Sequence, residues 1–203
     1  MRKIQDHYFK KAKQERYPAR SVYKLQEAQD KYRFLTKGDK VLDLGCHPGS
    51  WSLYAARTLG PAGLVVGADL QRSGGRQVEG GAPIRWLTAD ITAPDFIAAV
   101  RDIAPRFQVV LSDAAPRTTG SRVTDEQRSL ELARQVLAIA AELLAPGGAL
   151  YCKIFEGEDF KEYVEEVRTR FGAVRIVKPK SSRPESREVF VLGTGFRPGR
   201  QEQ

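Results

Sequence analysis

Short apolar runs alternate along the chain with stretches whose apolar residues recur at helical spacing. The short runs are rich in branched residues and are bounded by glycine, proline or acidic residues, which predicts buried strands. Seven such strands are expected, at residues 41–44, 64–69, 84–89, 107–112, 149–154, 174–177 and 188–192. Because helices alternate with these strands, we predict a Rossmann-like α/β fold: a seven-stranded, mostly parallel sheet with helices on both faces.

Helices are predicted between the strands and in an N-terminal arm. The expected ranges are residues 3–16, 51–59, 95–103, 124–144 and 158–171, with one further helix that Ser21 caps. The apolar face of this further helix would comprise Val22, Leu25, Ala28, Tyr32 and Leu35, and Lys24 would lie near its start. The glycine-rich residues 71–82 predict a surface loop. We expect a single domain with a basic helical arm (1–38), a core (39–195) and a short tail (196–203).

Positive charge is concentrated at the two ends of the chain. Residues 1–40 hold 12 Lys/Arg and 5 Asp/Glu, and residues 168–200 hold 9 and 2, so each end carries +7. Residues 41–167 hold 12 and 17, a charge of −5. A charge run can be an ordinary solvated face, but this segregation favours a polyanion partner such as RNA. A membrane surface fits less well, because the basic ends lack a clear aromatic-lined amphipathic face.

Other classes of protein are disfavoured by composition. No apolar run approaches the length of a membrane span, and the N-terminal Met-Arg-Lys has no apolar segment behind it, so we expect no signal peptide. Cys46 and Cys152 lie in or beside predicted buried strands, and we expect them to be reduced and structural in a cytoplasmic protein. The histidines, His7 and His47, are too few for a zinc cluster, so no metal site is expected.

The stretch Lys40-Val-Leu-Asp-Leu-Gly-Cys-His-Pro-Gly-Ser-Trp-Ser52 combines a strand, a glycine turn and the start of a helix. Such a turn can admit a ligand against bare backbone, although it can also be no more than a turn. Gly45 and Gly49 follow a Gly-x-x-x-Gly spacing, which is neither the dinucleotide fingerprint nor a P-loop. Asp43, an acid inside the strand, suits a ligand with an amine or a positive charge. S-adenosylmethionine therefore fits better than a pyrophosphate.

Charged residues also mark the ends of the later strands. Asp69 ends the second strand, where an acid can bind both ribose hydroxyls of a nucleoside, and Asp90 follows the third, where it could hold an adenine amino group. Asp113 and Lys153 end the fourth and fifth strands, which should be neighbours. A lysine in an apolar run needs a partner or a function, unless it extends its amine to solvent. Glu188, which opens the last strand, could reach the same site.

Two classes of methyltransferase fit poorly. Enzymes that methylate base amino groups use Asp/Asn-Pro-Pro-aromatic after the fourth strand, but Ser112-Asp-Ala-Ala-Pro116 is followed by no aromatic residue on which a base could stack. Carbon-5 methyltransferases need a cysteine nucleophile near the target, and neither cysteine is convincingly placed for that role.

Nine motifs, spread over nearly the whole chain, resemble those of one family. They are Asp6-His-Tyr8, Ser21-x-x-Lys-Leu25, Leu42-Asp-Leu-Gly45, Pro48-Gly49-x-Trp51-Ser52, Ser112-Asp-x-x-Pro116, Arg128-Ser-Leu-Glu-Leu132, Pro146-Gly-Gly148, Lys153-x-Phe155-x-Gly157 and Lys178-Pro-x-Ser-Ser-Arg-x-x-Ser-Arg-Glu188. The chain thus resembles the FtsJ/RrmJ family of S-adenosylmethionine-dependent RNA ribose 2′-O-methyltransferases. It is most similar to the bacterial branch that methylates a uridine of large-subunit ribosomal RNA, which implies the assembled large subunit as partner. We expect a monomer.

The resemblance also implies roles for individual residues. The family's catalytic tetrad falls on Lys24, Asp113, Lys153 and Glu188. Its cofactor residues fall on Gly49, Trp51, Asp69, Asp90 and Asp113, to which the glycine turn adds Asp43 and Gly45. The chain departs from the family pattern at His47 and Ser50, where Ala and Gly are usual, at Arg117, where Asn is usual, and in the loop at residues 71–82.

A ribose 2′-hydroxyl must attack the sulfonium methyl in line, so the enzyme mainly has to position groups and stabilise charge. Lys153 would contact the 2′-oxygen while Asp113 and Glu188 orient its ammonium, and Lys24 would hold the same oxygen or its phosphate. The resemblance implies that Lys153 accepts the proton. Two flanking carboxylates favour the ammonium form, however, whereas a base near neutrality must lose its proton. We favour charge stabilisation by Lys153, and both roles stay open.

Other functions remain to be separated from methylation of a large-subunit uridine. The target could be transfer RNA or another RNA. A small-molecule methyltransferase with the same fold is disfavoured by the basic ends, and an RNA-binding relative without catalysis is disfavoured by the complete tetrad. The basic ends contain few aromatic residues that we expect to be exposed, which favours recognition of RNA shape and backbone over unstacked bases.

Overall fold

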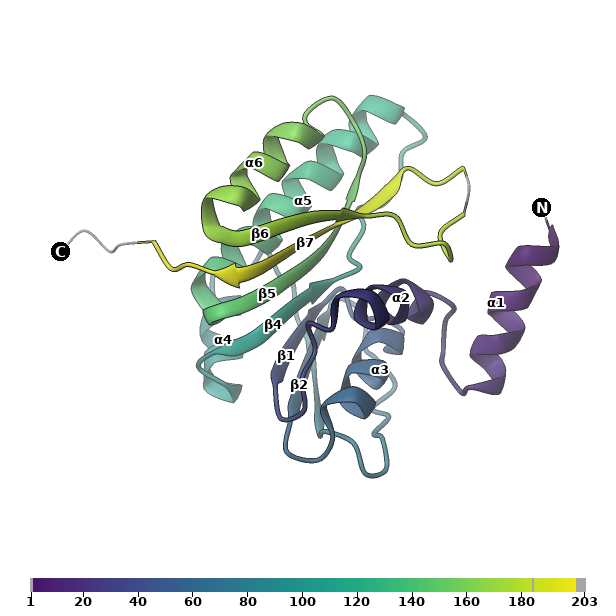
Figure 1. Ribbon diagram of the computed structural model, residues 1–203, viewed down its shortest axis with the longest axis vertical. Helices are drawn as coiled ribbons and strands as arrows, with labels where there is room; N and C mark the ends of the chain where they lie inside the picture. Colours follow the sequence, from purple (N-terminus) through teal and green to yellow (C-terminus); the bar gives the residue numbers. More distant parts are fainter. Residues whose placement is uncertain (1, 184, 200–203) are drawn as a thin grey trace.

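A seven-stranded sheet forms the centre of the computed structural model, which describes residues 2–183 and 185–199 (Figure 1). Residues 200–203 of the predicted tail lie outside this description. The strands are β1 (Lys40–Leu44), β2 (Leu64–Asp69), β3 (Ile84–Thr88), β4 (Phe107–Ser112), β5 (Leu144–Phe155), β6 (Phe171–Val177) and β7 (Glu188–Phe196). Their order is β3-β2-β1-β4-β5-β7-β6. Among the described strands, β7 alone runs in the opposite direction to the other six, so the predicted mostly parallel α/β fold is confirmed.

Helices cover both faces of the sheet (Figure 1). They are α1 (Arg2–Gln14), α2 (Val22–Tyr32), α3 (Ser50–Leu59), α4 (Phe96–Ile103), α5 (Arg122–Leu143) and α6 (Phe160–Arg170). Both faces bury aliphatic and aromatic side chains: the core under α4, α5 and α6 includes Phe96 and Tyr163, and the core under α2 and α3 includes Trp51, Tyr151 and Phe190. The helix α1 packs outside α2 through contacts such as that between Tyr8 and Tyr23, whose ring centroids lie 5.2 Å apart.

The strand order places a ligand-binding edge where the sheet changes direction. The first strand pairs with β2 on one side and with β4 on the other, so the connections leave in opposite directions at this point. The carboxyl ends of β1 and β4 therefore open onto a crevice, which is the usual ligand position in open α/β sheets. The glycine turn after Leu44 and the segment after Ser112 both begin at this edge.

Two details of the predicted second helix were wrong. The helix α2 ends at Tyr32 because Arg33 adopts a left-handed conformation, with φ 52°, and Leu35 is buried after the helix has ended. Ser21 occupies the N-cap position, but its side chain makes no capping hydrogen bond. Its carbonyl instead accepts the indole N–H of Trp51 at 2.8 Å.

Other expectations match the described residues. No helix or strand interrupts the glycine-rich loop at residues 71–82. Cys46 and Cys152 are buried and unpaired. None of the helices in the described part of the chain is both long enough and apolar enough to cross a membrane.

Candidate active site

Four charged side chains from distant parts of the chain meet at one end of the sheet. Lys24 lies in the first turn of α2, Asp113 directly follows β4, Lys153 lies near the end of β5, and Glu188 opens β7. Strands β4 and β5 are parallel neighbours, and β7 returns antiparallel beside β5, so all three strand ends meet at the same edge. The helix α2, which packs on one face of the sheet, adds Lys24 at the same edge. The structure thus brings together all four residues of the predicted tetrad.

Ion pairs of alternating charge connect the tetrad into a ring. The Nζ of Lys153 lies 3.0 Å from Asp113 Oδ1 and 3.8 Å from Glu188 Oε1. The Nζ of Lys24 lies 2.9 Å from Glu188 Oε2 and 3.7 Å from Asp113 Oδ1. Each lysine therefore contacts both carboxylates, and the four charges sum to zero.

Backbone contacts fix the two lysines further. Lys153 also donates to the Asp113 carbonyl, and the hydroxyl of Tyr151 donates to the Lys24 carbonyl at 3.2 Å. Lys24 and Lys153 expose only 9% and 7% of their surface, so both side chains are held in packed surroundings.

The electrostatics of the ring keep Glu188 ionised. Burial alone would raise the pKa of this carboxyl, but the positive charges of Lys24 and Lys153 outweigh burial and lower its pKa. This carboxylate pairs with both lysines, through Oε2 with Lys24 and through Oε1 with Lys153.

A cavity of about 860 Å³ adjoins the ring at the carboxyl ends of β1 to β4. Its walls are Gly45, His47, Asp69, Leu70, Gln71, Ala89, Asp90, Ile91, Thr92, Asp113, Ala114, Ala115, Pro116, Arg117, Arg128, Glu131, Leu132 and Gln135. The cavity size is that of sites for nucleoside-sized ligands. Asp113 belongs to both the cavity and the tetrad, so a ligand in the cavity lies beside the four charges.

The two glycines of the turn have different tasks. Gly45 lines the cavity with φ +72°, and a Cβ there would lie 2.6 Å from the Cα of Ala114, so any side chain would close the approach. Gly49 is the N-cap residue of α3 and has φ +105°. A Cβ on Gly49 would lie 2.9 Å from the ring of Trp86. Gly49 does not line the cavity, and its role is to let the turn form.

Two of the predicted acids, Asp69 and Asp90, line the cavity and accept hydrogen bonds from its loops. Asp69 accepts the backbone N–H of His47 at 3.0 Å on one oxygen and that of Gln71 at 2.8 Å on the other. Asp90 accepts the backbone N–H and the hydroxyl of Thr92, and these bonds lower the pKa of its carboxyl. Each carboxylate oxygen has more than one lone pair, so both acids can accept further hydrogen bonds from a ligand.

Asp43 and Trp51 do not line the cavity. Asp43 is fully buried; its Oδ2 accepts the hydroxyl of Ser52 at 2.6 Å, while its Oδ1 has no hydrogen-bond partner among the described residues. Burial raises the pKa of this carboxyl to about 7. Trp51 is buried on the α2 side of the sheet and stacks on Tyr151, with ring centroids 5.6 Å apart. The structure therefore places Trp51 in the aromatic core and outside the cavity wall.

Sequence reasoning missed part of the cavity wall. Leu70 is 69% exposed although it directly follows a strand, and it offers an apolar surface beside Asp69. The sequence gives no signal for this role of Leu70, because an apolar residue beside a buried strand is expected to be buried. Its exposure in the structure identifies it. Arg117, noted as a departure from the family pattern, also lines the cavity. Within residues 2–183 and 185–199, no three His, Cys, Asp or Glu side chains gather as a metal site would require.

Comparisons with known proteins agree with this geometry. The FtsJ-like methyltransferase family matches residues 17–196. The chain is 54% identical to a ribosomal RNA large subunit methyltransferase E of Desulfotalea psychrophila, covering 97% of this chain and 98% of the relative. It is 48% identical to the protein of the same name from Nitratidesulfovibrio vulgaris, covering 97% and 96%. The crystal structure of a ribosomal RNA methyltransferase from Plasmodium falciparum superimposes with a TM-score of 0.76 at 25% identity, covering 89% of this chain and 98% of the other.

Proposed function

The chain belongs to the FtsJ-like methyltransferase family, and from that premise we propose that it methylates a ribose 2′-hydroxyl, that of a uridine, in large-subunit ribosomal RNA, with S-adenosylmethionine as methyl donor. The observation that carries the proposal is the neutral ring of Lys24, Asp113, Lys153 and Glu188 beside a nucleoside-sized cavity. Relatives at 48–54% identity are named for the same class of RNA.

The residues of the cavity fit S-adenosylmethionine. Asp69 would accept its ribose hydroxyls, Asp90 its adenine amino group, and Leu70 would pack against the adenine ring. Asp43 lies behind the cavity wall, two residues before Gly45, and its carboxylate would attract the positive charge of the methionine part without direct contact. When bound, this cofactor supplies an electrophilic methyl group. Gly45 permits its close approach to the backbone, and Asp113 places it next to the tetrad.

The tetrad would act on the ribose oxygen by position and charge. Lys153 is held by two carboxylates and a carbonyl, so its ammonium points to a fixed place instead of following the substrate. There it would donate to the 2′-oxygen and stabilise negative charge as that oxygen attacks. Lys24, on the opposite side of Glu188, would hold the same oxygen or its phosphate. Because Lys153 Nζ lies 3.0 Å from Asp113 Oδ1 and 3.8 Å from Glu188 Oε1, we propose charge stabilisation as its main role and not proton acceptance.

The partner would be ribosomal RNA within the assembled large subunit, and the protein would act as a single-domain monomer in the cytoplasm. The two basic ends of the chain support an RNA partner, because phosphates are bound by clustered Lys and Arg. A protein that recognises RNA mainly by its shape and its sugar-phosphate backbone would gain selectivity from a folded RNA target.

Labelled cofactor tests the reaction and the substrate together. Large ribosomal subunits without the modification, protein-free ribosomal RNA and transfer RNA are each incubated with enzyme, and the product is mapped by alkaline cleavage. We expect methylation of the large subunits, poor methylation of free RNA, and a uridine that resists alkali because its 2′-oxygen is blocked. Transfer to a base atom would overturn the reaction, and transfer to transfer RNA alone would overturn the substrate.

A further inference from the structure

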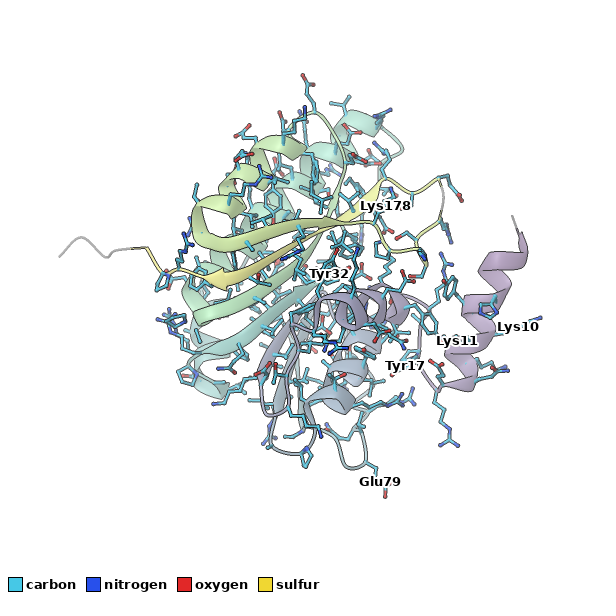
Figure 2. All side chains as sticks on the ribbon, viewed as in Figure 1. Lys10, Lys11, Tyr17, Tyr32, Glu79 and Lys178 are labelled. Carbon is cyan, nitrogen blue, oxygen red and sulfur yellow. The ribbon has the colours of Figure 1, made fainter. Side chains whose placement is uncertain are left out.

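A second hollow lies at the far end of α2, away from the tetrad. It measures about 460 Å³ and is lined by Lys31, Tyr32, Arg33, Phe34, Gly147, Ala149, Arg175, Leu192 and Thr194. We call these residues the α2–β6 groove. The lining combines positive charge with aromatic surface and includes no acidic residue. Figure 2 labels Tyr32 where α2 ends beside the strands.

Two cations from different elements flank one aromatic ring in this groove. Lys31 Nζ lies 5.0 Å from the centroid of the Tyr32 ring, and the guanidinium carbon of Arg175, from the edge strand β6, lies 5.6 Å from it. The aromatic ring of Tyr32 is only partly buried. None of Lys31, Arg33 and Arg175 forms an ion pair with another residue in the described part of the chain. Their charge is therefore available to a partner.

This combination matches the chemistry of a nucleotide in a single strand. Lysine and arginine bind phosphates, and an aromatic ring offers a face on which any base can stack. We propose that the α2–β6 groove binds an unpaired nucleotide of the substrate RNA a few positions away from the methylated one. The inference rests on the proposed function for the identity of the RNA, but the groove itself can be tested by RNA binding alone.

The distance between groove and tetrad suits a single RNA strand. Lys24 and Lys31 are seven residues apart on α2, which corresponds to about 10 Å of helix. Ala149 and Lys153 are four residues apart on β5, or about 13 Å of strand. Stacked nucleotides repeat at about 3.4 Å along one strand, so the groove would receive a nucleotide roughly three or four positions from the target.

Further positive charge lies along the route between the two sites. Beyond Arg175, β6 ends at Val177 and Lys178 follows, in the segment that leads to Glu188. Figure 2 labels Lys178, which follows β6, and Tyr32, at the end of α2. A strand whose target ribose lies at Lys153 could therefore continue past Lys178 and Arg175 to Tyr32.

Two substitutions separate phosphate binding from stacking. Arg175→Ala removes a cation from an exposed position, and Tyr32→Leu removes the aromatic face but keeps an apolar side chain against the core. Arg85→Ala is the matched control, because Arg85 is also an exposed arginine on an edge strand, β3, at the opposite side of the sheet. Tyr32→Trp keeps a stacking surface and should retain binding, which distinguishes lost stacking from a disturbed fold.

The binding probes are a fluorescein-labelled 12-nucleotide single-stranded RNA and its duplex form, followed by anisotropy at several salt concentrations. We expect Arg175→Ala to weaken binding of the single strand about 3- to 10-fold and to lower the salt slope by about 0.7, since one phosphate contact is lost. Tyr32→Leu should weaken binding of the single strand by about 5-fold or more without changing the salt slope, and should affect the duplex less. Arg85→Ala should match the wild type, and cofactor affinity measured by calorimetry should be the same in all variants.

The groove would be excluded if Arg175→Ala and Tyr32→Leu bound single-stranded RNA as tightly as Arg85→Ala, or if Tyr32→Leu weakened single strand and duplex equally. Methylation of large subunits is measured in parallel, and there the variants should raise KM and leave kcat unchanged. A wild-type protein that fails to methylate the subunits, while the variants still lose single-strand affinity, would reject the proposed function and retain the groove.

Discussion

The tetrad and the cavity beside it meet at Asp113 but are built in different ways. In the tetrad, four charged side chains hold one another: Lys24 and Lys153 each lie within 3.8 Å of both carboxylates. In the cavity, the acids hold backbone instead, as when Asp69 accepts the N–H groups of His47 and Gln71. The tetrad has its geometry before any ligand arrives, whereas the cavity has its shape from loops.

We expect the tetrad and the cavity to have different functions because of this difference. A preformed array of charges stabilises a transition state well, because nothing has to reorganise as charge develops. A loop-built cavity contributes mainly to ground-state binding, which changes affinity before it changes the rate at saturation. Substitutions in the tetrad should therefore lower turnover, whereas substitutions in the cavity should lower cofactor affinity.

The largest effect is expected for Lys153→Ala. The substitution removes the ammonium that would contact the 2′-oxygen, and turnover should fall by a factor on the order of 10² or more. Cofactor affinity should stay near the wild-type value, because the side chain does not line the cavity. Single-turnover methylation and calorimetry measure the two quantities.

Lys161→Ala serves as the control for this variant, since Lys161 is an exposed lysine on α6 with no part in the site. Near wild-type turnover in Lys153→Ala would remove the tetrad from the mechanism. A pH–rate profile of the wild type then addresses the role of Lys153: a lysine-type ionisation near neutrality would favour proton acceptance over charge stabilisation.

Asp69→Ala should show the opposite behaviour. It removes the carboxylate that we propose as the acceptor for the cofactor ribose, and it also frees the N–H groups of His47 and Gln71. Loss of hydrogen bonds to a charged group, at about 1.5–3 kcal/mol, corresponds to roughly 10- to 100-fold weaker cofactor binding. Turnover should recover at high cofactor concentration. Unchanged cofactor affinity by calorimetry would place the ribose contact on another residue.

The fold was predictable from local pattern because each strand is bounded by residues that stop it. The predicted ranges of β2 and β4 match the structure residue for residue, and in both an acid marks or follows the end. The helix α2 was predicted too long because apolar spacing continues to Leu35, whereas the left-handed backbone at Arg33 ends the helix first. Apolar periodicity carries no information about that backbone conformation.

The site was predictable in membership but not in geometry. Charged residues at strand ends predicted that Asp113, Lys153 and Glu188 meet, because strand ends of a parallel sheet lie at one edge, and the motif resemblance added Lys24. The contact between Lys24 and Glu188 joins residues 164 positions apart, and no local pattern contains it. Trp51 shows the converse: its motif suggested a cofactor contact, but Tyr151 and Phe190, from distant strands, bury it in the core.

Asp43 provides a pH test of the comparison, since it is a buried acid without the partners that the tetrad acids have. Its pKa is raised from the ordinary value to about 7 by burial, so the protonated form favours the folded state. That contribution is complete below the unfolded pKa, near 4, and is lost as pH rises to about 7, at up to about 1.4 kcal/mol per pH unit. Asp43→Asn cannot titrate and can still accept the Ser52 hydroxyl.

Urea unfolding of wild type and Asp43→Asn at pH 5 and pH 7, without cofactor, measures this effect. We expect the stability of the variant relative to the wild type to increase between these two pH values. Equal changes in the free energy of unfolding for both proteins would show that Asp43 does not titrate in this range.

The smallest effect on turnover is expected for Glu27, which does not belong to the tetrad but contacts the backbone beside it. Glu27 lies one turn after Lys24 on α2, and its carboxylate accepts the backbone N–H of Lys180 at 2.6 Å and of Ser181 at 3.0 Å. The helix that supplies Lys24 therefore also holds the segment that leads into Glu188. Glu27→Ala should leave both N–H groups without this acceptor and lower turnover a few-fold, while Glu27→Gln, whose single carbonyl oxygen can still accept one of them, should fall between it and the wild type.

Asp30→Ala is the matched control for Glu27, because Asp30 is an exposed acid on the same helix. Cofactor affinity should be unchanged in all three variants, since none lines the cavity. If Glu27→Ala weakened cofactor binding as much as turnover, the loop would support the cavity as well, and the separation between the two regions would fail. If it matched Asp30→Ala, the four tetrad side chains would hold their geometry through their own ion pairs. The graded order wild type, Gln, Ala would instead show that a preformed charge array still depends on the backbone around it.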